Sequence, residues 1–304
     1  MARPLLVILV GPTAIGKTKV AIELAKKLDT EIISADSRQF YEETSIGTAK
    51  PTIEERKAVV HHFVDFLSIH DEYSAGDFER EVLEQLEESF ESNPVMIMTG
   101  GSGLFIQAVT HGFDPLPSNP NIREQLNKQF EASGIETLQI ALKEKDPEHF
   151  AAMDIHNPQR LIRALEVCIA SGEKYSKLRK KEAKKRPFDM LMVGLNTDRE
   201  ALYDRINQRV DEMIENGLIE EAEQLKEFKE LNALNTVGYK ELFRHFDGQS
   251  SRQEAIEEIK KNTRNFAKRQ LTWFNKNKEI KWFDLKESDQ LIDWVMEQIT
   301  RRAV

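Results

Sequence analysis

The residues with the clearest chemical potential lie at 11–18 and read GPTAIGKT. This pattern, Gly-x-x-x-x-Gly-Lys-Thr, is typical of a phosphate-binding loop. In such a loop the glycines allow backbone N–H groups to surround an anion, and the helix that follows adds its partial positive charge. Lys17 would supply a point charge to bridging phosphate oxygens, and Thr18 would offer its hydroxyl to Mg²⁺. The motif predicts a bound phosphate compound and leaves its identity open.

The residues around this loop have the pattern that the motif requires. The apolar run LLVILV at 5–10 predicts a buried strand, and residues 19–25 have the spacing of an amphipathic helix. Strand, glycine loop and helix are the context in which the motif binds phosphate. An ordinary strand–turn–helix without a ligand is the alternative interpretation.

A second chemical group follows the next predicted strand. Residues 30–36 form a short apolar run that ends on Asp36. Proteins that hydrolyse nucleotides usually end a further strand in a carboxylate that holds Mg²⁺, but the buried run at 94–99 is followed by Gly100 and Gly101. The residues therefore leave two options. One is phosphoryl transfer with Asp36 as the base, and the other is a reaction in which a phosphate group is only held and leaves.

Composition limits the class of protein. The chain has 304 residues, of which 40% are hydrophobic and 31% are charged, which is typical of a soluble globular protein. Its net charge of −9 excludes a wholly basic surface, so nucleic acid could be bound only by local basic patches. The single cysteine, Cys168, excludes a disulfide and a cysteine-based zinc site. No apolar run is long enough to cross a membrane, and we expect a cytoplasmic protein.

The elements that must position these groups alternate along the first part of the chain. Predicted strands at 5–10, 30–36, 61–66 and 94–99 are separated by predicted helices, which favours an α/β fold with a parallel sheet flanked by helices. Ligands of such sheets bind at the carboxyl ends of the strands. Loop 11–18, Asp36 and the glycine-rich turn at 100–103 should therefore face one crevice.

The pattern changes at 114–120, where three prolines indicate a hinge or linker. Residues 121–185 are helical in pattern, and a buried strand at 188–195 returns to the sheet. Helices are predicted from 198 to about 275, followed by a short strand at 281–285 and a closing helix. We predict three segments, namely 1–115 as the first part of a P-loop core, 116–186 as an inserted all-helical domain, and 187–304 as the second part of the core with a helical C-terminal region.

Two basic runs stand out against the acidic total. The run at 174–186 contains eight Lys or Arg residues, and the run at 260–274 mixes basic and aromatic side chains. A solvated helix face is the usual explanation of such a run, and contact with an RNA backbone is the alternative. The pair His61 and His62 lacks a cysteine partner, so packing or hydrogen bonding is favoured over metal binding.

Together these patterns resemble the tRNA dimethylallyltransferase (tRNA isopentenyltransferase) family along nearly the whole chain. The phosphate-binding loop alone is shared by many families, whereas the strings at 34–51 and 268–273 are far more specific. The stretches that carry the resemblance are 11–18, 34–41, 46–51, 73–78, 157–166, 205–213, 237–240 and 267–273.

The resemblance implies transfer of a dimethylallyl group from dimethylallyl diphosphate to N6 of the adenine 3′-adjacent to the anticodon of tRNA, with release of diphosphate. Loop 11–18 would then hold the leaving diphosphate, so no water-activating carboxylate is needed. The partners implied are the tRNA anticodon stem-loop and dimethylallyl diphosphate, and the cofactor is Mg²⁺. We expect no membrane, no obligatory protein partner, and a monomer.

The family's pattern also implies residue roles. Asp36 would accept a hydrogen bond and then the proton of the adenine amino group, because an aromatic amine is a poor nucleophile. Arg209 would neutralise charge on the leaving group, with Arg205 as a second candidate one helical turn earlier and ion pairs to nearby acids as the alternative. Ser102 replaces the threonine that is commoner in the family. The catalytic residues expected are Lys17, Thr18, Asp36, Ser102 and Arg209, with Thr18 as the metal ligand.

Two binding sets follow from the same resemblance. Gln39 would read the adenine edge through its amide, and the base must leave its stack to reach Asp36. The diphosphate-binding set is Gly11, Pro12, Thr13, Ala14, Ile15, Gly16, Lys17, Thr18, Arg205 and Arg209. The tRNA-binding set is Asp36, Ser37, Arg38, Gln39, Ser102, Arg123, Gln159, Arg160, Leu161, Ile162, Arg163, Lys268 and Arg269.

Three alternatives remain open from the residues. The first is an enzyme that prenylates free AMP or ADP, against which the long helical C-terminal half and its basic segment argue weakly. The second is a small-molecule kinase that uses Asp36 as its base. The third is a non-catalytic RNA-binding protein with a relic phosphate loop, which the intact Lys17, Thr18 and Asp36 disfavour.

Overall fold

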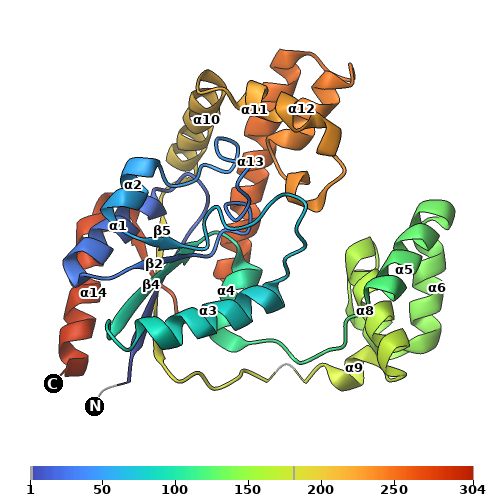
Figure 1. Ribbon diagram of the computed structural model, residues 1–304, viewed down its shortest axis with the longest axis horizontal. Helices are drawn as coiled ribbons and strands as arrows, with labels where there is room; N and C mark the ends of the chain where they lie inside the picture. Colours follow the sequence, from blue (N-terminus) through green and yellow to red (C-terminus); the bar gives the residue numbers. More distant parts are fainter. Residues whose placement is uncertain (1–2, 181, 304) are drawn as a thin grey trace. The chain divides into compact units, whose positions relative to one another are not determined.

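The computed structural model describes residues 3–180 and 182–303, and the chain separates into two compact units. Unit 1 consists of Met1–Thr110 with Arg186–Val304, and unit 2 is His111–Lys185. Both are coloured along the sequence in Figure 1, where unit 2 runs from green to yellow. Among the described residues, no helix is both long enough and apolar enough to cross a membrane.

Unit 1 is built on a six-stranded parallel sheet, so the predicted fold class is confirmed. The strand order β3-β2-β4-β1-β5-β6 places β1 at the centre of the sheet, between β4 and β5. The carboxyl ends of β1, β2 and β4 consequently lie at one edge, as expected for a parallel sheet. The strands are β1 (Leu5–Val10), β2 (Ile32–Ser34), β3 (His61–His62), β4 (Val95–Gly100), β5 (Asp189–Asn196) and β6 (Lys281–Asp284).

Both faces of the sheet are covered, which explains why β1 is apolar at every position. Leu6 and Ile8 join a core on one face, whereas Val7 and Leu9 join a second core on the other. The first core contains side chains from α3 (Ala75–Ser89) and α4 (Gly103–His111). The second contains side chains from α1 (Lys17–Leu28) and α14 (Ser288–Ala303). Figure 1 shows α1 and α14 side by side.

Two predicted strands are shorter than expected. Instead of 30–36 and 61–66, the structure has Ile32–Ser34 and His61–His62. The strand β3 ends at His62 because Phe63 and Asp65 take left-handed backbone conformations, with φ of 61° and 54°. This leaves the chain after each strand free to form the irregular walls of the site.

The helical region predicted from 198 to 275 is interrupted several times. Gly217 and Gly238 have φ of 99° and 102°, values that a continuous helix cannot accommodate. The chain here forms α10 (Arg199–Glu215), α11 (Leu218–Gln224), η1 (Lys226–Phe228), η2 (Asn232–Leu234), α12 (Tyr239–Phe246) and α13 (Arg252–Phe274). The two remaining helical segments of unit 1 are α2 (Ile53–Ala58) and η3 (Leu285–Glu287).

Unit 2 is a helical unit with its own apolar core. Leu138, Leu142 and Leu161 are completely buried in it. Asn119, Asp146 and Asn157 each cap a helix that begins with proline, a strong local start signal. The helices are α5 (Pro120–Ser133), α6 (Ile135–Lys145), α7 (Pro147–Ala152), α8 (Pro158–Ser171) and α9 (Tyr175–Leu178).

The helical pattern predicted through residue 185 is wrong at its end. The last helix of unit 2 stops at Leu178, and the described residues 179, 180 and 182–188 contain no helix. Basic side chains in this run are three to four positions apart, so they would repel one another on a helix face. The charge run at 174–186 is therefore not the solvated face of one helix.

Candidate active site

The phosphate-binding loop connects β1 to α1 in a shape that depends on its two glycines. Gly11 has φ 153°, and a Cβ added there would lie 2.5 Å from the Leu195 carbonyl oxygen. Gly16 has φ 100° and immediately precedes α1. The helix begins at Lys17, two residues earlier than the sequence pattern indicated. Lys17 and Thr18 therefore lie in the first helical turn, where a helix favours anions.

Lys17 is held on the loop itself. Its Nζ donates hydrogen bonds to the carbonyl oxygens of Gly11 (3.0 Å) and Pro12 (2.9 Å). Burial lowers the pKa of Lys17 to about 8; Asp36 opposes this shift and Arg209 adds to it. The ammonium group is thus held in a place where a nearby anion would stabilise its charged form.

Asp36 lies where two strand ends are joined. The backbone N–H of Ser102, after β4, donates to the Ala35 carbonyl at 3.2 Å, and the hydroxyl of Ser102 accepts from the Ser37 N–H at 3.0 Å. One Asp36 carboxylate oxygen accepts the N–H of Arg38 at 3.2 Å. Ser102 therefore fixes the turn that carries Asp36, and its hydroxyl is sufficient for these contacts without the threonine methyl.

Two arginines reach the phosphate-binding loop from α10. The Nε of Arg205 donates to the Ala14 carbonyl at 2.9 Å, and Arg209 contacts the Thr13 hydroxyl at 3.4 Å. Burial lowers the pKa of Arg209, and Asp36 opposes this shift. Both arginines hydrogen-bond to the phosphate-binding loop. Ion pairs with nearby acids, the alternative considered from the sequence, do not account for these hydrogen bonds.

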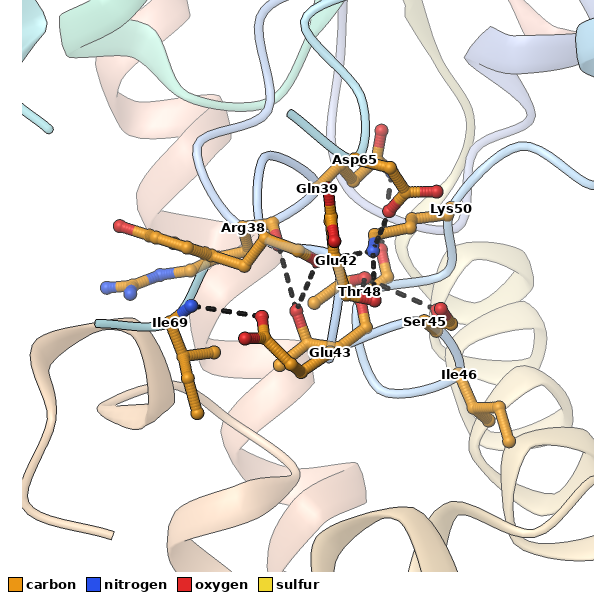
Figure 2. Close-up of polar contacts among 12 residues, drawn as sticks. Arg38, Gln39, Glu42, Glu43, Ser45, Ile46, Thr48, Lys50, Asp65 and Ile69 are labelled. Atoms are coloured by element: carbon orange, nitrogen blue, oxygen red, sulfur yellow. Dashed lines mark hydrogen bonds and ion pairs between the residues drawn. The ribbon is translucent and has the colours of Figure 1, made fainter. Parts of the chain in front are cut away.

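Gln39 and Arg38 point into different surroundings. The amide nitrogen of Gln39 donates to the carbonyl oxygens of Thr48 (3.2 Å) and Ala49 (3.1 Å). The guanidinium of Arg38 donates to backbone carbonyls in the segment 232–235. Figure 2 shows side chains of the segment between Arg38 and Lys50, together with Asp65 and Ile69, and the polar contacts among them.

Two cavities meet at Asp36. The first, of about 400 Å³, is lined by the phosphate-binding loop and by polar side chains that include Gln39, Arg205 and Arg209. The second, of about 530 Å³, has many apolar lining side chains, such as Phe105 and Met213. The residues that line both are Thr13, Asp36, Thr48, Ala49, Arg209 and Gln270.

The basic segment on α13 forms part of the wall of the second cavity. Arg269 and Trp273 line it, Lys268 is exposed on the same helix, and Arg269 stacks over Phe266 at 5.8 Å. Phe274 is buried, whereas Phe266 and Trp273 are more than a third exposed. The aromatic residues of this run are therefore divided between the core and the cavity wall.

The residues expected to bind tRNA from unit 2 fall into two groups. Gln159 and Arg160 are exposed in the first turn of α8. Leu161 and Ile162 are buried in the core of the unit, so their side chains are unavailable to a ligand.

Arg123 and Arg163 share one buried carboxylate. Arg123 Nη2 lies 2.7 Å and Arg163 Nη1 2.9 Å from the same Glu166 oxygen. Burial opposes ionisation of Glu166, but hydrogen bonds from the two arginines and from the Asn119 N–H outweigh it and lower its pKa to about 2. Part of each guanidinium is therefore committed within unit 2.

Among the described residues, no group of three or more His, Cys, Asp or Glu side chains is placed to hold a metal ion. His62 Nε2 lies 2.7 Å from a carboxylate oxygen of Glu31, and His61 Nδ1 lies 2.8 Å from the Val59 carbonyl. The histidines thus have the hydrogen-bonding surroundings that the sequence favoured. Any metal at the phosphate site would need oxygens from its ligand in addition to Thr18, which lines the first cavity.

Three residues with a clear place in the site were missing from the predicted sets. Gln270 is buried and lines both cavities. Glu221 and Tyr239 contact the segment 45–51, which forms part of the wall of both cavities. Two of them lie in strings that carried the resemblance, at 237–240 and 267–273. A buried glutamine within a basic, aromatic helix was the available signal, because a buried amide needs specific partners.

Comparison with known proteins is consistent with this geometry. The sequence profile of the IPP transferase family matches residues 39–277. The tRNA dimethylallyltransferase of Christiangramia forsetii is 53% identical over 296 residues, covering 97% of this chain and 98% of the relative. That of Flavobacterium johnsoniae is 48% identical over 302 residues, covering 97% and 98%.

Solved structures match most of this chain. The tRNA isopentenylpyrophosphate transferase of Bacillus halodurans has a TM-score of 0.74 at 35% identity and covers 99% of this chain and 98% of its own. A eukaryotic dimethylallyltransferase acting on tRNA has a TM-score of 0.78 at 26% identity, covering 93% and 74%. The chain belongs to the IPP transferase family.

Proposed function

We propose that the protein transfers a dimethylallyl group from dimethylallyl diphosphate to N6 of the adenine 3′-adjacent to the anticodon of tRNA and releases diphosphate. The observation that carries this function is the position of Asp36, which lines both the polar cavity at the phosphate-binding loop and the more apolar cavity beside it. A base at this junction can act on a nucleophile from one side while a leaving group is held on the other.

The polar cavity suits the diphosphate. Loop N–H groups, the first turn of α1 and the cations Lys17, Arg205 and Arg209 surround a site for negative charge. Their charges would stabilise the diphosphate as it takes up the electron pair of the breaking C–O bond. The lowered pKa values of Lys17 and Arg209 support this assignment, because a bound anion relieves the cost of burying each cation.

The chemistry at Asp36 completes the transfer. The lone pair of N6 forms the new C–N bond as the C–O bond to diphosphate breaks, and the excess proton on nitrogen passes to the Asp36 carboxylate. Ser102 holds the turn at Ser37 through its hydroxyl, which keeps Asp36 at the junction. The family's pattern assigns Gln39 to the adenine edge. Its amide nitrogen donates to the Thr48 and Ala49 carbonyls, so its oxygen, which has a second lone pair, would be the atom that accepts from the adenine amino group.

Mg²⁺ fits the donor set as a partner of the diphosphate rather than as a fully protein-bound ion. The hydroxyl of Thr18 is a hard oxygen donor that lines the polar cavity, and the remaining ligands would be diphosphate and water oxygens. When bound, the ion supplies Lewis-acid neutralisation of the leaving group.

We propose that tRNA contacts both units. In unit 1 the support is the basic and aromatic cavity wall that includes Arg269 and Trp273, with the exposed Lys268 beside it on the same helix. In unit 2 it is the exposed Gln159 and Arg160 at the start of α8, where the helix terminus favours phosphate. This assigns the helical unit as a tRNA-contacting insertion.

One experiment tests the proposed function. The protein is incubated with dimethylallyl diphosphate, Mg²⁺ and either unmodified tRNA or AMP, and the products are analysed by mass spectrometry of nucleosides. Prenylated adenine in tRNA is the expected result. Product in AMP but not in tRNA would identify an adenylate prenyltransferase instead, and consumption of ATP with a phosphorylated product would identify a kinase.

A further inference from the structure

The segment 45–51, called the 45–51 loop below, is held by one carboxylate of α11. Glu221 accepts hydrogen bonds from three successive backbone N–H groups, those of Ser45 (2.9 Å), Ile46 (2.8 Å) and Gly47 (2.9 Å). Bonds to an ionised acceptor are among the stronger hydrogen bonds in proteins. The loop itself forms walls of both cavities through Thr48 and Ala49.

Tyr239 reinforces this hold. Its hydroxyl donates to Glu221 at 2.5 Å, and the whole side chain is buried. Burial raises the pKa of Tyr239 and the neighbouring Glu221 carboxylate raises it further, so the phenol remains a donor. The ring lies against Gly47, where an added Cβ would be 2.7 Å from ring atoms. Glu221 and Tyr239 therefore both hold residues 45–47. Glu221 accepts hydrogen bonds from the backbone N–H groups, and the ring of Tyr239 packs against Gly47.

The other end of the loop reaches the site. The carbonyl oxygens of Thr48 and Ala49 accept both hydrogen bonds donated by the Gln39 amide. The other atom of that amide, its oxygen, lies 3.2 Å from the Ser34 hydroxyl. Arg209 adds a longer contact of 3.5 Å to the Ala49 carbonyl, although it also contacts Thr13. The orientation of Gln39 thus depends chiefly on where the two loop carbonyls lie.

The remaining polar contacts that we describe for the loop are with residues near it in the chain. Lys50 pairs with Asp65, as Figure 2 shows. The Thr48 hydroxyl donates to the Thr44 carbonyl at 2.7 Å. Glu221 differs because it lies far along the chain, being 176 positions from Ser45. It connects the loop to the helical C-terminal part of unit 1.

We propose that Glu221 and Tyr239 are positioning residues that set the 45–51 loop and, through its carbonyls, the orientation of the Gln39 amide, whose oxygen keeps a lone pair for the acceptor base. This inference rests on the proposed prenyl transfer. Neither residue lines the polar cavity, so each acts through the loop and not by contact with diphosphate. Their loss should impair use of tRNA while the binding of diphosphate persists.

The first experiment measures how strongly Glu221 and Tyr239 protect the 45–51 loop from exchange, and it does not require catalytic turnover. Hydrogen–deuterium exchange is followed by mass spectrometry on peptides that contain residues 45–47, for the full chain and the variants Glu221→Ala, Glu221→Gln and Tyr239→Phe. We expect exchange in these peptides to rise at least about tenfold in Glu221→Ala and less in the two conservative variants. Glu223→Ala, an exposed residue of the same helix, is the matched control. Unchanged exchange in Glu221→Ala would overturn the proposal.

The effect on the reaction is measured next. We expect Glu221→Ala to lower kcat/KM for tRNA by about tenfold or more, with partial recovery in Glu221→Gln, because the amide keeps one acceptor oxygen. Affinity for inorganic diphosphate, measured by calorimetry, should change less than about threefold. A variant that is merely misfolded would lose both in proportion to its inactive fraction.

A double-mutant cycle decides whether the effect passes through Gln39. In a Gln39→Ala background, Glu221→Ala should lower kcat/KM by less than about threefold, since its route of action is already gone. Fully additive losses would contradict the proposal. Should Glu221→Ala fail to fold, Tyr239→Phe provides the same cycle. A wild-type protein without prenyl transfer would contradict the proposed function alone, because the exchange experiment reads the loop independently of turnover.

Discussion

Lys17 and Arg209 carry charges that the folded protein holds at a cost. Burial lowers the pKa of both side chains, although Asp36 lies close enough to oppose the shift in each. A group whose charged form is disfavoured by burial gains most when a charge of opposite sign binds beside it. The energetic preference for a polyanion is therefore built into the two residues and does not depend on the shape of the loop alone.

The pH dependence of diphosphate binding should report on Lys17. Because its pKa is lowered to about 8, the ammonium loses its proton as pH rises through about 8, and affinity for inorganic diphosphate should fall above that pH. Calorimetry across the neutral to alkaline range checks this. Lys17→Arg, which stays charged throughout, controls for ionisation of diphosphate itself and should lack the decline. An equal decline in both proteins would show that Lys17 is not responsible.

Asp36 should separate binding from turnover. We expect Asp36→Asn to leave affinity for diphosphate within about threefold of the wild type, because the cations and loop N–H groups remain. Its turnover of tRNA should fall by about 10²-fold to 10⁴-fold, the usual contribution of a positioned base. Single-turnover kinetics and calorimetry on the same preparations make the comparison. Parallel losses of binding and turnover would mean that Asp36 is structural.

Among the secondary-structure elements, α13 joins the two glycine turns of the site. The buried Gln270 accepts the Thr13 N–H at 2.8 Å and donates to the Gly101 carbonyl at 3.0 Å. The absence of a side chain at Gly101 permits this, since a Cβ there would lie 2.2 Å from the Gln270 amide. One amide therefore sets the spacing between the phosphate-binding loop and the end of β4.

Truncation of this amide should weaken both turns. Gln270→Ala leaves a part-buried donor and a buried acceptor without partners, so we expect the free energy of unfolding to fall by about 2 kcal/mol and diphosphate to bind less tightly. Denaturant titration and calorimetry measure the two effects. Asn265→Ala, exposed on the same helix, is the control and should change neither. A fall in stability with no change in diphosphate affinity would leave Gln270 a packing residue only.

In unit 2 the buried carboxylate of Glu166 joins several segments, as the Gln270 amide does in unit 1, because it binds Arg123, Arg163 and the Asn119 N–H. Its pKa is lowered from 4.5 to about 2 in the folded protein, so its contribution to stability is present above about pH 4.5 and is lost as pH falls toward 2. The contribution is about 3 kcal/mol. Exchange of α8 peptides as a function of pH should show this loss in the wild type. Glu166→Gln should be destabilised at neutral pH and show a weaker pH dependence, and identical pH profiles would contradict the role.

The order of the elements could be predicted from the sequence because each depends on local patterns. LLVILV at 5–10, the glycine loop and the helix starts of unit 2, where an Asn or Asp cap precedes proline, are all readable from neighbouring residues. The left-handed Phe63 that ends β3 and the break at Gly217 were not readable, because tertiary packing selects those conformations. Glu221 and Gln270 were missed for the same reason, since they act on backbone groups 174 and 169 positions away.

For the molecule as a whole, the net charge of −9 repels an RNA backbone, so the proposed binding of tRNA would depend on a few local basic residues. Lys268 and Arg269 belong to unit 1, and Arg160 to unit 2. If each contacts phosphate, Lys268→Ala with Arg269→Ala and, separately, Arg160→Ala should each weaken tRNA binding and flatten its dependence on salt.

The decisive variant combines all three substitutions. Removal of each phosphate contact should reduce the slope of log affinity against log salt by about 0.7 to 0.9, and the reductions from the two units should add, because their residues share no partner. Filter binding at several salt concentrations measures the slopes, with Lys128→Ala, an exposed lysine of α5 that pairs with Glu124, as the control. A slope unchanged by Arg160→Ala would confine the tRNA interface to unit 1, whereas additive slopes require one tRNA to engage both units at once.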